Sequence, residues 1–335
     1  MSTQPIISMQ GVSKRFVKSV DTAGKIANLM GANNVPEVVH AVNNVNLDVF
    51  HGEVVGLVGE SGCGKSTLGR VVAGIHHPTE GKILFEGQDL HKMSSTSQKK
   101  ETLAIQMIFQ DPMASLNPRM RVQDIVGEAP VYHGIVKSGE MQDHVAQVLE
   151  RVGLDPVYMR RYPHQFSGGQ RARIGIARAL AVNPRFLVCD ESVAALDVSI
   201  QAQVLNLFMK LRKELNLTYL FISHDLSVVR YLSDRVVIMY LGRVVESAPS
   251  QQLFSGPNHP YSQALLDNVP SLVNRNKRFS TIKGEIPSPL NPPSGCHFHP
   301  RCPKAGPRCK AQAPVLKELT PNHFSACHLN DGGVQ

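Results

Sequence analysis

The stretch Gly59-Glu-Ser-Gly-Cys-Gly64-Lys65-Ser66-Thr67 decides the fold of this chain. It fits the pattern G-x-x-x-x-G-K-[ST], in which a glycine-rich turn joins a buried strand to a helix. The flanks agree, because the apolar run 54–58 precedes it and a helical pattern over 68–73 follows. In such a turn, backbone N–H groups face a polyphosphate, the lysine reaches the terminal phosphates and the serine hydroxyl binds Mg²⁺. We therefore predict phosphate binding by the whole stretch: Gly59, Glu60, Ser61, Gly62, Cys63, Gly64, Lys65, Ser66 and Thr67.

A second candidate element is the strand pattern Phe186-Leu-Val-Cys-Asp190-Glu191. A buried strand here delivers two carboxylates to its C-terminal end, where ligands collect in open α/β sheets. We predict that Asp190 belongs to the Mg²⁺ shell and that Glu191 polarises a water molecule in line with the γ-phosphate. Taken alone, an apolar strand that ends in Asp-Glu is more often just a strand end. The phosphate-binding stretch favours the functional interpretation.

A third element is Ser167-Gly168-Gly169-Gln170, which precedes an amphipathic helix pattern over 171–181. Two glycines and a serine at a helix start can form an anion cradle, and they can equally form an ordinary helix cap. One chain does not need two phosphate cradles for one nucleotide. The residues alone therefore favour the cap.

The composition is that of a folded globular protein. Of the 335 residues, 42% are hydrophobic and 19% charged, and 35 Lys and Arg against 27 Asp and Glu give a formal net charge of +8. No apolar run approaches the roughly 20 residues of a membrane span, and the N-terminus lacks a basic region followed by an apolar one. The positive charges are scattered, so we expect solvated surface rather than a nucleic-acid stripe, and a cytosolic protein.

Short apolar runs alternate with helical patterns, which predicts a parallel sheet covered on both faces. The expected strands include 185–189, 218–223 and 235–240, with helices over 199–215 and 226–232 between them. The chain before Phe85 is rich in strand patterns, with 39–49, 53–58 and 82–85 as strands, whereas 111–184 is helical. Residues 17–36 interrupt the strand pattern, so we expect an insertion there with a short helix over 23–30.

Beyond Gly256 the chain becomes rich in proline, which predicts a separate, loop-rich C-terminal module. Four cysteines crowd into it, and in a reducing cytosol they are more typical of metal binding than of disulfides. Four thiolates can hold a tetrahedral Zn²⁺ or a [4Fe–4S] cluster, and plain reduced thiols are the third alternative. These cysteines are Cys296, Cys302, Cys309 and Cys327, and the neighbouring His297, His299, His323 and His328 could compete as ligands.

Together these motifs resemble the ATP-binding cassette (ABC) family. The tetrad Ser167–Gln170 is similar to the family's signature motif, which contacts the γ-phosphate of a nucleotide held by the facing subunit. This resemblance removes the need for two cradles in one chain. The other family positions follow in order: Phe16 resembles the aromatic that stacks on adenine, Gln110 the Q-loop glutamine at Mg²⁺ and the γ-phosphate, Asp197 the D-loop aspartate and His224 the switch histidine.

The resemblance implies an α/β P-loop NTPase fold with an N-terminal antiparallel β subdomain. The implied ATP-binding domain covers 1–255, with a helical subdomain over about 111–184, and a small extension covers 256–335. One position departs from the family, since Ser192-Val193 follows Glu191 where Pro-Thr or Pro-Val is common. Both carboxylates remain, so we expect altered loop stiffness and retained hydrolysis.

The C-terminal module is similar to the extension of oligopeptide and dipeptide importer ATPases. The similarity lies in the stretches 258–266, 284–290 and 292–296. Nickel, opine and other small-solute importers belong to the same subfamily, so the resemblance defines the transported solute less closely than the ATPase role. Some members carry an iron–sulfur cluster in this region, which favours a cluster over zinc or free thiols.

The resemblance implies an ATP-hydrolysing subunit that powers peptide import. Its implied partners are a second, homologous cassette, two membrane permease subunits and an extracytoplasmic solute-binding protein, with no nucleic acid. Its implied place is the cytoplasmic face of the bacterial inner membrane. A soluble ABC ATPase acting on nucleic acid or ribosomes is the alternative from a different class, although such proteins commonly hold two cassettes in one chain. An iron–sulfur sensor with a vestigial ATPase is a further alternative, and the retained Lys65, Asp190, Glu191 and His224 oppose it.

Overall fold

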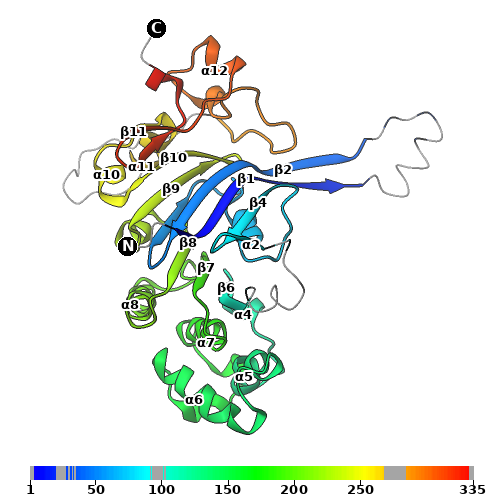
Figure 1. The fold of residues 1–335 in the computed structure, drawn as a ribbon, viewed down its shortest axis with the longest axis vertical. Coiled ribbons are helices and arrows are strands. Elements are labelled where there is room, and N and C mark those ends of the chain that lie inside the picture. Colours follow the sequence, from blue (N-terminus) through cyan, green and yellow to red (C-terminus); the bar gives the residue numbers. More distant parts are fainter. Residues whose placement is uncertain are drawn as a thin grey trace.

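The computed structural model describes residues 4–19, 28, 31, 33, 35–90, 92, 101, 103–267 and 284–331, which form two sheets with helices around them (Figure 1). The strands are β1 (Pro5–Lys18), β2 (Glu37–Phe50), β3 (Val54–Val58), β4 (Glu80–Phe85), β5 (Gln88–Asp89), β6 (Ile105–Ile108), β7 (Phe186–Asp190), β8 (Thr218–Ile222), β9 (Arg235–Tyr240), β10 (Arg243–Pro249), β11 (Lys317–Thr320) and β12 (His323–Ser325). The α-helices are α2 (Lys65–Val72), α4 (Pro112–Ser115), α5 (Val122–Tyr132), α6 (Met141–Arg151), α7 (Gly168–Leu180), α8 (Val198–Leu215), α9 (Leu226–Leu232), α10 (Ser250–Ser255), α11 (Pro260–Asp267) and α12 (Pro307–Ala311).

The larger sheet has eight strands in the order β11-β12-β10-β9-β3-β8-β7-β6, of which β9, β3, β8, β7 and β6 run parallel. The apolar runs predicted as strands are β7, β8 and β9, and they are buried along nearly their whole length. Continuous burial is expected of parallel strands with helices on both faces. The α/β fold class predicted from the sequence is confirmed.

The smaller sheet is antiparallel, in the order β2-β1-β4-β5, and α2 packs between the two sheets. Strands β1 and β2 form a long hairpin that projects from the body of the molecule (Figure 1). The insertion expected over 17–36 falls in sequence between the two strands, because β1 continues to Lys18 and β2 begins at Glu37. The short helix expected over 23–30 falls outside the described residues except for Asn28.

Helices α4 to α7 form the helical region predicted over 111–184. Their apolar faces meet in one core, because the buried residues of α5, α6 and α7 recur at three- and four-residue spacing; the core includes Val122, Val126, Val145, Leu149, Ile174 and Ala177. Figure 1 shows α5 and α6 at the end of the molecule opposite the C-terminal elements. Within the part of the chain that the structure describes, no helix combines the length and the apolarity that crossing a membrane requires.

The segment after Gly256 is less separate than its composition predicts. Strand β12 pairs with β10, placing Ser325 opposite Glu246, so two C-terminal strands extend the larger sheet. Tyr261 and Phe298 are buried in the same core cluster as Val58 at the end of β3. A strand as short as β12 leaves no readable alternation, because three residues cannot establish a period.

Buried His259 links this segment to β10 and makes its stability depend on pH. Its ring accepts the Tyr261 backbone N–H at Nδ1 (3.1 Å), and its own backbone N–H donates to Glu246 Oε2 (2.9 Å). Burial lowers the pKa of the His259 imidazole to about 4, with 1% of the residue exposed. An unfolded imidazole titrates at about 6.5, so the unfolded state binds more protons between these values. Stability is therefore full above about pH 6.5 and falls as the pH drops towards 4.

We expect His259→Asn to remove this pH dependence while keeping the hydrogen bond, because an asparagine Oδ1 can accept the same N–H. Between pH 7 and pH 5, the wild type should lose about 2 kcal/mol of unfolding free energy more than the variant. Chemical unfolding at the two pH values measures the difference. Parallel losses in both proteins would mean that His259 does not titrate over this range.

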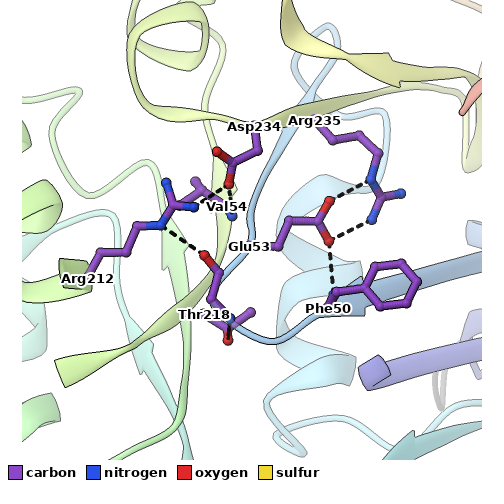
Figure 2. Close-up of polar contacts among 8 residues, drawn as sticks. Phe50, Glu53, Val54, Arg212, Thr218, Asp234 and Arg235 are labelled. Atoms are coloured by element: carbon purple, nitrogen blue, oxygen red, sulfur yellow. Dashed lines mark hydrogen bonds and ion pairs between the residues drawn. The ribbon is translucent and has the colours of Figure 1, made fainter. Parts of the chain in front are cut away.

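Polar contacts also fix the N-terminal ends of the central parallel strands (Figure 2). Arg235 donates to both carboxylate oxygens of Glu53 (2.7 and 3.0 Å), and Glu53 also accepts the Phe50 N–H. Asp234 accepts from Arg212 and from the Val54 N–H, at 2.6 and 2.8 Å. These contacts hold β3, β9 and the C-terminal end of α8 together at the edge opposite the phosphate-binding stretch.

Replacing Glu53 with glutamine should lower the free energy of unfolding by about 2 kcal/mol. The Glu53 and Arg235 side chains are only 15% and 17% exposed, so the guanidinium would lose a charged partner away from bulk water. Glu214→Gln is the matched control, because Glu214 is 49% exposed and its pair with Lys210 should contribute less than about 0.5 kcal/mol. Equal losses in the two variants, measured by denaturant titration, would contradict the prediction.

Candidate nucleotide site

The phosphate-binding stretch forms the turn between β3 and α2, and two of its glycines are required by close backbone approach. A Cβ at Gly64 would lie 2.1 Å from the Ala41 carbonyl oxygen, and Gly64 has a φ of 103°. A Cβ at Gly59 would lie 2.1 Å from the Met239 carbonyl oxygen. A residue with a Cβ does not fit at either position, because the Cβ would clash with the carbonyl oxygen, and at Gly64 the left-handed φ also disfavours it. The turn is thus pressed against β2 and β9.

Lys65 and Ser66 begin α2 inside this turn. Lys65 is 4% exposed, and its Nζ donates to the carbonyl oxygens of Gly59 (2.7 Å) and Glu60 (3.0 Å). Ser66 Oγ donates to Asp190 Oδ1 at 2.8 Å. Burial raises the pKa of the Asp190 carboxyl, and the Ser66 hydrogen bond opposes this effect. A hydroxyl and a carboxylate at this spacing are oxygen donors of the kind that Mg²⁺ prefers.

Glu191, directly after β7, is held between two predicted site residues. Its Oε2 accepts from Gln110 Nε2 at 2.8 Å, and its Oε1 lies 3.3 Å from His224 Nδ1. The Glu191 backbone has a φ of 45°, a conformation that costs free energy in a residue other than glycine. Its N–H donates to the Ile222 carbonyl oxygen, which fixes the backbone against β8.

The topology explains why these residues meet. The phosphate-binding stretch follows β3, His224 follows β8, Glu191 follows β7 and Gln110 follows β6, and these strands are consecutive neighbours in the sheet. Parallel strands bring their C-terminal ends to one edge, where ligands of open α/β sheets bind. The side chains predicted from separate motifs therefore converge on one edge.

A pocket of about 320 Å³ lies at this edge. Its lining combines residues of the phosphate-binding stretch, Gln110 and Glu191 with apolar side chains. Phe16 is 37% exposed, so a flat ring has an accessible aromatic partner in this pocket. Pro289, within the stretch 284–290 of the C-terminal segment, also lines the pocket, although the sequence assigned it no role in the site. The lining residues are Phe16, Val39, Ala41, Ser61, Gly62, Gly64, Lys65, Ser66, Thr67, Gln110, Glu191 and Pro289.

The tetrad Ser167–Gln170 and Asp197 do not line this pocket. Ser167 caps α7, because its Oγ accepts the Gln170 N–H (3.3 Å) while Gln170 Oε1 accepts the Ser167 N–H (3.0 Å). The cap interpretation of these residues is confirmed. A Cβ at Gly168 would lie 3.7 Å from Leu196, so the tetrad lies beside the segment that contains Asp197. The second cradle is absent from the chain's own pocket.

The four C-terminal cysteines do line one small pocket, together with His299 and His328. Its volume of about 20 Å³ leaves room for about one water molecule. Burial raises the pKa of the Cys296 thiol to about 11 and also raises the pKa of the Cys302 and Cys327 thiols. Across the described residues, no group of three or more His, Cys, Asp or Glu side chains is arranged to hold a metal ion. The expected zinc or [4Fe–4S] site is thus not assembled in this structure.

Cys63 and Cys189 are both buried in the hydrophobic core. Burial raises the pKa of both thiols. Both side chains therefore stay protonated near neutral pH, and neither has the depressed pKa of a nucleophilic cysteine.

Comparisons with known proteins show the family of this chain. Residues 42–194 match the model of the ABC transporter family, and residues 245–309 match the oligopeptide/dipeptide transporter C-terminal region. The chain is 54% identical over 295 residues to the oligopeptide transport ATP-binding protein AppF of Bacillus subtilis, covering 87% of this chain and 90% of that protein. It is 46% identical over 328 residues to a putative peptide import ATP-binding protein of Brucella ovis, covering 98% of each.

Solved structures give the same fold. The protein cbiO1 from Clostridium perfringens, part of the ABC transporter complex cbiONQ, aligns with a TM-score of 0.60 at 26% identity, covering 75% of this chain and 91% of that chain. The dimeric ATP-binding cassette MJ0796 bound to ADP and Pi aligns with a TM-score of 0.61 at 26% identity, covering 73% and 98%. The chain therefore belongs to the ABC transporter family of ATP-hydrolysing subunits. Within that family, its C-terminal match places it in the group with the oligopeptide/dipeptide transporter C-terminal region.

Proposed function

We propose that this chain is the ATP-hydrolysing subunit of an ABC importer that powers the uptake of dipeptides and oligopeptides through separate membrane subunits. The observation that carries the proposal is the Glu191 carboxylate between Gln110 and His224, beside the pair Ser66–Asp190. The similarity to oligopeptide transport ATP-binding proteins supports the peptide cargo. Nickel, opine or another small solute is the alternative cargo for the same machine.

In the proposed mechanism, backbone N–H groups of the phosphate-binding stretch and Lys65 bind the phosphates of ATP. Ser66, Asp190 and Gln110 would hold Mg²⁺, which neutralises charge on the terminal phosphates when bound. Glu191 accepts a proton from the attacking water, and Gln110 orients its carboxylate through the 2.8 Å hydrogen bond. His224 contacts the γ-phosphate, and Phe16 stacks on adenine.

A second cassette, homologous rather than identical, completes the catalytic site in this proposal. Ser167, Gly168, Gly169, Gln170 and Asp197 act on the nucleotide of that facing subunit. Support comes from their position, because they lie outside the chain's own pocket while the capped start of α7 leaves Ser167 and Gly168 exposed. The N-terminus of a helix favours anions, so it suits a γ-phosphate supplied by another subunit.

The further proposed partners are two membrane permease subunits and an extracytoplasmic solute-binding protein. The chain would lie at the cytoplasmic face of the bacterial inner membrane as a peripheral subunit. The helical region over 111–184 is suited to transmit motion, because Gln110 joins its first residues to Glu191 in the nucleotide site. Nucleotide binding and the position of these helices are therefore mechanically connected.

Reconstitution of the transporter in proteoliposomes tests this function. We expect ATP hydrolysis to rise when a peptide-loaded binding protein is present and labelled peptide to accumulate inside. Uptake of nickel or an opine without peptide uptake would show that the importer carries a different solute, and the role of this chain as its ATPase subunit would stand. Hydrolysis that responds to DNA, RNA or ribosomes and not to membrane subunits would overturn the proposal.

For the cysteine pocket we propose a [4Fe–4S] cluster in preference to Zn²⁺, on the basis of its donor set. Cys296, Cys302, Cys309 and Cys327 supply four thiols around one pocket, and thiolates suit both groups. Anaerobic purification followed by iron, sulfide and zinc analysis tests this proposal. A brown protein with iron and sulfide supports the cluster, whereas a colourless protein with zinc, or with neither metal, contradicts it.

A further inference from the structure

Glu60, in the phosphate-binding stretch, is held by the C-terminal segment through two separate contacts. Its backbone N–H donates to the hydroxyl of Tyr261 on α11 at 2.9 Å. Its carboxylate accepts two hydrogen bonds from Arg301, from Nη1 at 2.7 Å and from Nη2 at 3.0 Å. Arg301 ends the short helix η4 (His299–Arg301) and lies 241 residues along the chain from Glu60.

Both partners are rigidly placed. The Arg301 side chain is 5% exposed, and its guanidinium lies 5.8 Å from the centre of the Tyr240 ring. Tyr261 is fully buried, with its ring 4.7 Å from that of Tyr240 and 5.3 Å from that of Phe298. A two-pronged ion pair with little solvent exposure fixes geometry more strongly than a surface pair. The contacts therefore fix Glu60 rather than merely touch it.

The position of Glu60 matters because its carbonyl oxygen accepts hydrogen bonds from other residues of the turn. The Glu60 carbonyl oxygen accepts from the Cys63 N–H at 3.3 Å and from Lys65 Nζ at 3.0 Å. The next residues, Ser61 and Gly62, line the nucleotide pocket, whereas Glu60 itself does not. A displacement of Glu60 would consequently shift the backbone N–H groups and the lysine that face the phosphates.

The same segment also lines the pocket directly. The Pro289 carbonyl oxygen accepts the His40 N–H at 2.9 Å, and Pro289 lines the pocket beside Val39 and Ala41 of β2. The C-terminal segment thus meets the nucleotide pocket in two ways, through its contacts with Glu60 and through Pro289 in the lining. Two independent contacts of this kind point to a role in shaping the pocket.

We propose that Arg301 and Tyr261 are positioning residues that hold the phosphate-binding stretch in its ATP-binding shape through Glu60. The proposal rests on the proposed function in one respect, namely that the pocket binds ATP. The C-terminal segment is then a structural part of the nucleotide site. Neither residue lines the nucleotide pocket, so both act through Glu60.

Arg301→Met tests this role, because it keeps an extended side chain and removes both hydrogen bonds to Glu60. In the full chain assembled with its partners, we expect the KM for ATP to rise about tenfold and kcat to change less than about threefold. Glu60→Gln should act in the same direction. If both substitutions act by removing the same ion pair, the KM for ATP of the double variant should not exceed the higher KM of the two single variants.

Arg235→Met is the matched control, because Arg235 makes the same two-pronged ion pair with Glu53 at the opposite end of β3 (Figure 2). It should lower thermal stability by a similar amount and leave the KM for ATP within about twofold. If Arg235→Met raises KM as much as Arg301→Met, or if Arg301→Met leaves KM unchanged, the positioning role is wrong.

Tyr261→Phe is a second, milder variant that tests the same role if Arg301→Met does not fold. It removes only the hydroxyl that accepts the Glu60 N–H, and we expect KM to rise about threefold with kcat unchanged. An unchanged KM in this variant would also count against the proposal. If the wild-type protein does not bind ATP, the proposed function is wrong. If the wild type binds ATP and Arg301→Met leaves that binding unchanged, only the positioning role is wrong.

Discussion

Replacing Glu191 with glutamine should leave ATP binding intact and slow ATP turnover by at least about a hundredfold. The amide keeps the size of the side chain and can still face Gln110 and His224, so the pocket retains its shape. It cannot accept the proton of the attacking water, because a neutral amide is a very weak base. We therefore expect unchanged nucleotide affinity together with a loss confined to kcat, measured by equilibrium binding and steady-state hydrolysis.

The matched control is Glu214→Gln, which makes the same chemical change on the exposed face of α8. Its turnover should equal that of the wild type. Retention of near-normal hydrolysis by Glu191→Gln would remove Glu191 from the mechanism. Loss of ATP binding in that variant would instead assign Glu191 to ground-state binding.

Replacing Gly168 with aspartate should abolish hydrolysis at the facing subunit's site while leaving this chain's own ATP binding unchanged. A carboxylate at the start of α7 would oppose the γ-phosphate there and obstruct the helix N–H groups, which costs at least about a hundredfold in turnover. The change is sterically mild within the chain, because the Cβ position lies 3.7 Å from Leu196, an ordinary contact. Turnover is measured in a chain that also carries Glu191→Gln, so that only the facing site works.

Gly139→Asp is the control for added charge, because Gly139 has no neighbour within 4 Å of its Cβ position. It should leave hydrolysis at both sites unchanged. If Gly168→Asp hydrolyses ATP normally in the assembled pair, the tetrad Ser167–Gln170 serves only as the cap of α7. If it weakens ATP binding by the isolated chain, the tetrad acts on the chain's own pocket, and the two-subunit site is wrong.

The phosphate-binding stretch and the Asp190-Glu191 strand end could be predicted from local sequence, because each combines a strand pattern with a short motif whose chemistry is specific. The contact Ser66–Asp190 follows from both lying at the same edge of one parallel sheet. Gln110 and His224 carry no such local signal, since a glutamine in a turn and a histidine before a helix are common. Family resemblance pointed to them, and the structure brings both to Glu191.

The C-terminal segment was the least predictable part of the fold. Its proline-rich composition suggested a separate module, whereas β12 pairs with β10 and Arg301 reaches Glu60. The crowding of four cysteines suggested a metal site, and the structure shows that they line one pocket of about 20 Å³. Neither outcome follows from spacing, because short strands and loops take their positions from long-range contacts rather than from local propensity.

By itself, the sequence determined the local parts of this protein: which runs become buried strands, where the glycine-rich turn must curl, and which carboxylates end a strand. These features follow from periodicity and backbone freedom, which act over a few residues. Only the tertiary structure decided that Gln110 and His224 flank the Glu191 carboxylate and that Arg301 of the C-terminal segment binds Glu60. Such contacts join residues up to 241 positions apart, and packing and ion pairing across that separation leave no periodic trace in the chain.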